Sequence, residues 1–182
     1  MSLSNVSIHT SATGGEIHQG DSTVLKILNR GGIYLDHETT SKKRLLEQVA
    51  NLFAEQLPDI EAASIFSTLI ERENLGSTGI GHGVALPHGR INGLPEVAGM
   101  FLRLQEPLDF DAVDHVPVNL IFAILVPHDA TEEHLKLLAG LANVFRDEQT
   151  RMKLLQTSDT SKIQEIFDIN VDELGKSACP TG

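Results

Sequence analysis

A glycine-rich stretch of the chain carries the side chain best suited to chemistry. Residues 76–90 read Gly-Ser-Thr-Gly-Ile-Gly-His-Gly-Val-Ala-Leu-Pro-His-Gly-Arg, which places His88 between Pro87 and Gly89. Proline fixes its own φ and keeps the preceding residue extended, so we expect His88 at a rigid strand end with little bulk after it. A neutral imidazole held in this way is a competent nucleophile near pH 7 toward an in-line phosphoryl donor. The residues alone also allow a tight turn in which His88 only ends a strand.

Two other side chains are candidates for binding phosphate oxygens. Arg72 lies shortly before the glycines at the end of an expected helix, where a guanidinium turned inward could bind a phosphoryl group through two hydrogen bonds. The same position suits an exposed arginine near the negative end of a helix dipole. His134 continues the apolar stripe of a later helix and lies near the end of an expected strand over 118–126, where open α/β sheets place their sites. Its spacing therefore allows either a core residue or a site residue.

The glycine loop offers further hydrogen-bond donors. Its backbone N–H groups can form an anion nest, and the hydroxyls of Ser77 and Thr78 could bind phosphate or stabilise a turn. A nucleotide-binding loop does not fit, because residues 79–83 lack the G-x-G-x-x-G spacing and no G-K-S/T follows. The G-x-S-x-G pattern of hydrolases is also missing. The histidines at 82, 88, 115, 128 and 134 match no zinc-motif spacing, so we expect no metal site.

Composition and charge narrow the classes of function. The 182 residues carry 14 Lys and Arg against 25 Asp and Glu, a net charge of −11 that repels nucleic acid. No stretch reaches the roughly 18 uncharged apolar residues of a membrane span. Residues 1–20 do not resemble a secretory signal, and the single Cys179 fits a reducing cytosol. We therefore expect a cytoplasmic protein with no membrane insertion and no nucleic-acid partner.

The spacing of apolar residues predicts the elements that must position these side chains. A short helical or extended entry is expected over 24–29, Thr40 or Ser41 caps the next helix, and Asp59 caps a further one that Gly76 stops. Later helices are expected from residue 131, over 148–156 and over 161–167. The expected strands lie at 33–35, 84–86, 97–104 and 118–126, with a short one over 106–110. The two long strands are nearly continuous apolar runs, which is typical of strands covered on both faces by helices.

This order of elements predicts an α/β fold, a single-domain sandwich with a mixed, mostly parallel sheet flanked by helices on both sides. Residues 1–23 are rich in Ser, Thr, Gly and His and are expected to form a disordered tail. The domain is expected over 24–171, and residues 172–182 form a C-terminal tail.

Several motifs together resemble the fructose/mannitol-type enzyme IIA family of the bacterial phosphotransferase system, and within it the nitrogen-related regulatory branch. The resemblance covers residues 24–171 and rests on these segments: Arg72-Glu73, residues 75–81, residues 85–90, residues 107–114, Pro117-Val118, residues 125–127 and His134-Leu135. It implies the mixed sheet described above. It also implies that His88 is the phosphorylated residue and that Arg72 and His134 stabilise the phosphoryl group. Ser77, Thr78 and Gly89 are the residues expected to form the phosphate-binding loop beside it.

The resemblance also implies partners. The phosphoryl group comes from phosphoenolpyruvate through enzyme I and an HPr-type phosphocarrier protein, and no cofactor is needed. Two functions remain open: a regulator whose phosphorylation changes its affinity for a target protein, or a carrier that passes phosphate to a sugar-specific enzyme IIB. The motif over 76–81 and the lack of an attached IIB or membrane domain favour the regulator.

Three points qualify this interpretation. A binding module that is never phosphorylated would be favoured if His88 were buried. His82 adds an imidazole that departs from the family pattern, and His128 is a further addition to it. We expect His115 and His128 on the surface.

Overall fold

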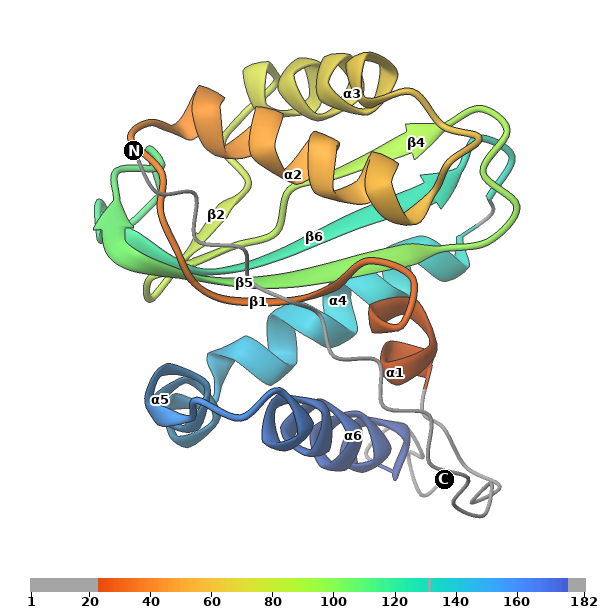
Figure 1. The fold of residues 1–182 in the computed structure, drawn as a ribbon. Coiled ribbons are helices and arrows are strands. Elements are labelled where there is room, and N and C mark those ends of the chain that lie inside the picture. Colours follow the sequence, from red (N-terminus) through yellow and green to blue (C-terminus); the bar gives the residue numbers. More distant parts are fainter. Residues whose placement is uncertain (1–22, 131, 177–182) are drawn as a thin grey trace.

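The described chain forms one mixed β-sheet between two layers of helices (Figure 1). The computed structural model describes residues 23–130 and 132–176. Of the tail expected over 1–23, all but Thr23 lies outside these residues, as does the end of the tail expected over 172–182. The elements are α1 (Thr23–Leu28), β1 (Gly32–His37), α2 (Lys42–Gln56), α3 (Ala62–Asn74), β2 (Gly79–Gly81), β3 (Val84–Ala85), β4 (His88–Ile91), β5 (Ala98–Leu108), β6 (Val118–Pro127), α4 (Glu133–Arg146), α5 (Glu148–Gln156) and α6 (Thr160–Lys176).

The sheet has the strand order β1-β5-β6-β3-β2, and β4 also pairs with β6. Among the pairings of the described strands, β1 with β5, β3 with β6 and β4 with β6 are parallel. The pairings of β5 with β6 and of β2 with β3 are antiparallel. The predicted fold, a mixed sheet with helices on both sides, is therefore confirmed.

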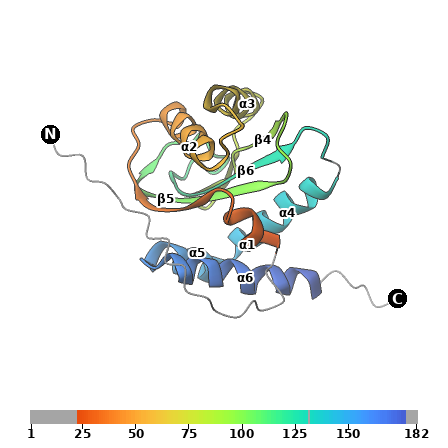
Figure 2. The same cartoon turned by 45° about the vertical axis from the view of Figure 1, so that its right-hand side comes forward.

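Both faces of the sheet are covered. Helices α2 and α3 lie on one face, and α1, α4, α5 and α6 lie on the other (Figures 1 and 2). Along β5, Met100 and Leu102 pack toward α2 and α3, whereas Phe101 between them packs toward α6. This alternation buries residues 98–104 of β5 and 120–126 of β6, which explains why these stretches are almost continuously apolar in the sequence.

The helix boundaries test the predicted caps. Ser41 caps α2 as predicted, since its Oγ accepts the N–H of Arg44 at 3.1 Å. The predicted cap at Asp59 is wrong, because α3 begins at Ala62 and has Glu61 at its N-cap position. A turn that buries Ile60 and joins its N–H to the carbonyl of Leu57 delays the start of the helix. The helix ends before Gly76, as predicted.

Three strand and helix predictions need correction. Residues 106–110 form no separate strand, because β5 continues through Pro107 to Leu108 and pairs again with β6 there. The glycine-rich segment, expected to contain one strand over 84–86, contains β2, β3 and β4. The last helix was expected over 161–167 but runs to Lys176, so the expected domain boundary at residue 171 falls inside α6.

Candidate functional site

A pocket of about 410 Å³ lies where β4 and β6 meet α3 and α4, and we call it the His88 pocket. Its lining comes from elements far apart in the sequence: Thr68, Glu71, Arg72, Leu75, His88, Gly89, Arg90, Ile124, Val126, His134, Leu135 and Leu138. Helices α3 and α4 lie on opposite sides of the sheet with the edge strand β4 between them (Figure 1). The structure therefore brings together Arg72, His88, Gly89 and His134, four of the predicted site residues.

His88 is the first residue of β4, which corrects the prediction that it stands at the end of a strand. Proline lacks an N–H group, so the parallel pairing with β6 is interrupted at Pro87 and resumes after it. The carbonyl of Pro87 accepts the N–H of Ile124 at 2.9 Å, and His88 lies in register with Ile124. The His88 side chain is half-buried and opens into the pocket. Full burial, the condition that favoured an unphosphorylated binding module, is not met.

Alternate residues of β4 face opposite layers of the fold. Gly89 and Ile91 face α2 and α3, since a Cβ on Gly89 would overlap with Cγ2 of Thr68 and Ile91 belongs to that core. His88 and Arg90 therefore face the α4 side of the sheet. Arg72 reaches His88 from the other layer, past the edge strand, because it lies one helical turn after Thr68 on α3.

The hydrogen bonds of His88 define its tautomer. Nε of Arg72 lies 3.1 Å from Nε2 of His88, and because a guanidinium can only donate, Nε2 must be the acceptor. The proton then resides on Nδ1, which donates to the carbonyl of Leu86 at 2.8 Å. Burial lowers the pKa of His88, and Arg72 and His134 lower it further, against the opposing effects of the hydrogen bond to Leu86 and of Glu73. The residue is thus a neutral imidazole whose Nε2 lone pair faces the pocket.

Arg90 is a second arginine in the pocket, and its place in the sequence motif alone predicted no role at the site for it. Its Nη1 donates to the carbonyls of His128 and Ala130 at 3.0 and 2.9 Å. Its Nη2 lies 3.0 Å from Nε2 of His134. The signal was available in the sequence, because residues two apart on a strand share a face and Arg90 stands two after His88.

The hydroxyls of Ser77 and Thr78 are directed into the protein. Ser77 donates to the carbonyl of Phe110 at 2.7 Å, and Thr78 donates to the Glu73 carboxylate at 2.6 Å. Neither residue lines the His88 pocket. The structure thus does not bring these two residues to the site, and their proposed contact with phosphate stays a prediction.

Glu73 is a buried carboxylate next to Arg72. From the sequence, Glu73 was only one residue of a family motif. Its Oε2 accepts both the N–H and the hydroxyl of Thr78, and its Oε1 lies 3.2 Å from Nζ of Lys42. Lys42 also pairs with Asp111 at 2.5 Å. These contacts join α2, the end of α3 and the glycine loop, and so hold the segment that carries Arg72.

Three other histidines considered from the sequence, His82, His115 and His128, do not line the pocket. His115 and His128 are exposed, as predicted. His82 is exposed as well, and it adopts a φ of 56° in the turn between β2 and β3, where its N–H donates to Asp114 at 2.7 Å. Within the described residues, no group of three or more His, Cys, Asp or Glu side chains could hold a metal ion.

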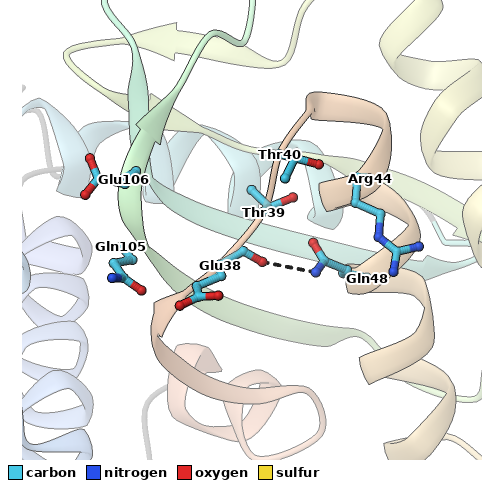
Figure 3. Close-up of a pocket in the computed structure, with 7 residues that line it drawn as sticks. All are labelled: Glu38, Thr39, Thr40, Arg44, Gln48, Gln105 and Glu106. Atoms are coloured by element: carbon cyan, nitrogen blue, oxygen red, sulfur yellow. Dashed lines mark hydrogen bonds between the residues drawn. The ribbon is translucent and has the colours of Figure 1, made fainter. Parts of the chain in front are cut away.

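A second pocket, of about 450 Å³, lies on the segment between β1 and α2 and against β5 (Figure 3). Seven polar residues line it: Glu38, Thr39, Thr40, Arg44, Gln48, Gln105 and Glu106. Two of them are joined directly, since Nε2 of Gln48 donates to the carbonyl of Glu38 at 3.1 Å (Figure 3). None of the predicted site residues lines this pocket, so the candidate chemistry is concentrated at His88.

Comparison with known proteins identifies a family. Residues 26–169 match the sequence model of one protein family, the EIIA 2 component of the phosphoenolpyruvate-dependent sugar phosphotransferase system. A nitrogen regulatory protein from Pseudomonas aeruginosa is 43% identical over 141 residues, which cover 78% of this chain and 92% of that protein. Across residues 23–130 and 132–176, no helix is both long and apolar enough to cross a membrane.

Solved structures agree with this match. The crystal structure of nitrogen regulatory protein IIA-Ntr from Neisseria meningitidis superposes with a TM-score of 0.76 at 44% identity, covering 80% of this chain and 99% of that one. The Escherichia coli complex of enzyme IIAMTL with phosphorylated enzyme IIBMTL gives a TM-score of 0.61 at 18% identity, covering 74% and 92%. At that identity the likeness is one of fold alone.

Proposed function

This chain belongs to the EIIA type 2 family of the phosphoenolpyruvate-dependent sugar phosphotransferase system, on its nitrogen-regulatory branch, and we propose that it carries a phosphoryl group on Nε2 of His88. The observation that supports this most is the pair of hydrogen bonds that fixes the His88 tautomer, at 3.1 Å from Arg72 and 2.8 Å to Leu86. They put the lone pair of His88 on Nε2, at the wall of an open pocket, where it accepts from Arg72 until a phosphoryl group arrives. The donor is a phosphorylated HPr-type protein, and the transfer takes place in the cytoplasm.

The transfer follows from the placement of these groups. The Nε2 lone pair attacks the phosphorus of the donor phosphohistidine, a nitrogen–phosphorus bond to His88 forms, and the donor nitrogen keeps the electron pair of the bond that breaks. Positive charge then develops on the His88 ring, and the Nδ1–H bond to the carbonyl of Leu86 stabilises it. Arg72 changes its acceptor from Nε2 to the phosphoryl oxygens, on which negative charge is spread in the transition state. No metal or cofactor takes part.

Mass spectrometry tests this proposal. The purified chain is incubated with phosphoenolpyruvate, enzyme I and an HPr-type protein, and the mass of the intact protein is measured. His88→Ala should fold normally and gain no phosphoryl group, whereas His115→Asn, which changes an exposed histidine, should be phosphorylated like wild type. Phosphorylation of folded His88→Ala would overturn the proposal.

We further propose that phosphorylation regulates a target protein, in keeping with the nitrogen regulatory proteins that the chain resembles. The alternative, transfer to an enzyme IIB, is favoured by the fold shared with an enzyme IIA that was solved in complex with a phosphorylated enzyme IIB. Single-turnover transfer from the phosphorylated chain to a purified fructose-type enzyme IIB separates the two. A regulator should transfer much more slowly to that IIB than back to the HPr-type donor, and equal rates would favour the sugar carrier.

A further inference from the structure

We propose that Arg90 is a positioning residue for phosphoryl transfer, which acts by fixing the place and the tautomer of His134. This inference rests on the proposed function of His88. It begins from the edge strand, where Arg90 and His88 project from the same face two residues apart. Both side chains line the same pocket together with His134.

The contacts of Arg90 converge on the segment that leads into α4. A single guanidinium donates to the carbonyls of His128 and Ala130 and also contacts the imidazole of His134. At the start of α4, Glu132 occupies the N-cap position and makes no side-chain capping hydrogen bond. The three contacts therefore fix the first turn of α4, which carries His134, relative to the strand that carries His88.

The contact with His134 also selects a tautomer. Arginine has no acceptor, so Nη2 of Arg90 must donate to Nε2 of His134, and a neutral His134 then carries its proton on Nδ1. His134 and His88 line the same pocket, so the orientation of the His134 ring sets which of its groups faces the proposed phosphoryl acceptor.

Neither lysine nor a neutral side chain can replace this arrangement. A guanidinium has donors on a planar fork that reach two carbonyls and an imidazole at once, whereas an ammonium is a single point of charge. Arg90 is exposed, so its hydrogen bonds contribute little to the stability of the fold. We therefore expect its loss to affect the rate of transfer much more than the melting temperature.

A double-mutant cycle on the full chain tests the inference. Arg90→Met should lower kcat for phosphorylation by about tenfold to a hundredfold. A group displaced by about 1 Å near the reacting atoms can slow a reaction by roughly a hundredfold. KM for the HPr-type donor should change little, and Arg90→Lys should recover only part of the loss. Because Arg90 acts through His134, the variant with both Arg90→Met and His134→Ala should be no slower than His134→Ala alone.

The matched control is Arg151→Met. Arg151 lies in α5 and contacts the C-terminal end of α4. Arg151 also donates to two backbone carbonyls, those of Phe145 at 2.7 Å and Arg146 at 2.8 Å, but it does not line the His88 pocket. Its transfer rate should equal that of wild type. An equal loss in Arg151→Met would mean that anchoring α4 anywhere is enough, and would overturn the inference.

A spectroscopic measurement keeps this inference separate from the proposed function. NMR of ¹⁵N-histidine in the unphosphorylated protein should show His134 with its proton on Nδ1, and Arg90→Met should shift it toward the Nε2–H form. An unchanged tautomer, or losses of rate that multiply in the double variant, would overturn the inference. If wild type accepts no phosphate at His88, the proposed function fails even where the NMR result stands.

Discussion

The Cγ2 methyl of Thr68 occupies the space that a Cβ on Gly89 would need, so helix α3 lies directly against the backbone of strand β4. Arg72 lies four residues after Thr68 on the same helix, and therefore on the same face. Its Nε reaches His88, the neighbour of Gly89, at 3.1 Å. Gly89 thus sets how closely Arg72 approaches His88, the proposed nucleophile.

Gly89→Ala should therefore impair the site by displacing α3. The added methyl overlaps with Thr68, and relief of an overpacked contact commonly costs about 1–3 kcal/mol of stability. A displacement of Arg72 by about 1 Å is enough to slow a transfer by roughly a hundredfold. Chemical denaturation and single-turnover phosphorylation measure the two effects on the same preparation.

Thr68→Ser supplies the control, because it removes the Cγ2 methyl and keeps the hydroxyl. The single variant should transfer at a rate near that of wild type. Combined with Gly89→Ala, it should restore most of both the stability and the rate. If the double variant is as slow as Gly89→Ala, the close approach of α3 is not what the glycine provides.

The lowered pKa of His88, caused first by burial, predicts an unusual pH profile. Only the neutral imidazole accepts phosphate, so the intrinsic rate should stay level as pH falls through about 6.5, the ordinary pKa of histidine, and should decline only below it. Arg72→Met removes the guanidinium charge that lowers this pKa and should move the decline toward pH 6.5. A wild-type profile with its midpoint at the ordinary pKa would contradict this prediction.

The same pKa shift predicts how stability depends on pH. The unfolded chain protonates His88 near pH 6.5, whereas the folded chain does so only at lower pH, so below about pH 6.5 the unfolded state binds more protons. Stability should fall as pH drops from about 6.5 to the folded pKa. His88→Gln should remove this part of the loss, measured as the difference in unfolding free energy between pH 8 and pH 5.5. His37, whose pKa is also lowered by burial, is present in both proteins and cancels.

Arg72 itself should matter to transfer rather than to folding. Loss of one donor to the charge that develops in a transition state commonly slows a reaction by about a hundredfold or more. We expect this for Arg72→Met, with a smaller loss for Arg72→Lys. The exposed Arg44, which pairs with Glu47, supplies the control, since Arg44→Met should leave transfer unchanged. A wild-type rate in Arg72→Met would mean that Arg72 does not stabilise the transferring phosphoryl group.

The sequence predicted the parts of the molecule whose causes are local. The apolar runs of β5 and β6 mark strands buried on both faces, and Ser41 caps a helix through its own hydroxyl. His88, the proposed nucleophile, also stands out in the sequence, because Pro87 and Gly89 constrain it from adjacent positions. Such effects involve only neighbours in the chain, so a pattern within one segment is enough to identify them.

The rest depends on contacts between distant segments. Arg90 meets His134 across 44 residues, and Lys42 meets Asp111 across 69, and no spacing within one segment predicts such pairs. Asp59 suits a helix cap chemically, yet the burial of Ile60 moves the start of the helix past it.

Arg103 should be one of the most destabilising positions outside the pocket. It is 6% exposed, and its Nη1 donates to the carbonyls of Leu154, Leu155 and Thr157 at the end of α5. Arg103→Met leaves these carbonyls without their donor, at a cost of about 1–3 kcal/mol. For a chain of this size we expect the melting temperature to fall by roughly 2–4 °C per kcal/mol.

Asp36→Asn is the comparison for Arg103, because Asp36 accepts from the same guanidinium but is largely exposed. An exposed partner contributes about 1 kcal/mol or less, so this variant should be nearly as stable as wild type. Transfer should be normal in whatever Arg103→Met protein stays folded. Equal destabilisation of the two variants would locate the effect in the ion pair rather than at the end of α5.

The last prediction concerns Glu73, whose side chain is 3% exposed and holds the glycine loop against α3. Glu73→Gln keeps the shape and an acceptor for Thr78, but it removes the charge that faces Lys42. A half-buried ammonium then loses its buried carboxylate, and only the exposed Asp111 is left to pair with it. We expect a loss of about 2–3 kcal/mol, of the size found when a buried ionic hydrogen bond loses one partner.

Lys42→Met separates the charge effect from the loop effect. Combined with Glu73→Gln it leaves no unpaired buried charge, only the exposed Asp111, so the double variant should be more stable than the sum of the single losses predicts. Glu73→Ala also removes the acceptor for both donors of Thr78, and it should slow phosphoryl transfer as well, because the end of α3 that carries Arg72 is released. Denaturation curves and single-turnover rates, measured on the four variants and on wild type, separate the charge effect from the loop effect. Strictly additive losses would mean that Glu73 and Lys42 act independently, and a normal rate in Glu73→Ala would mean that the glycine loop does not position Arg72.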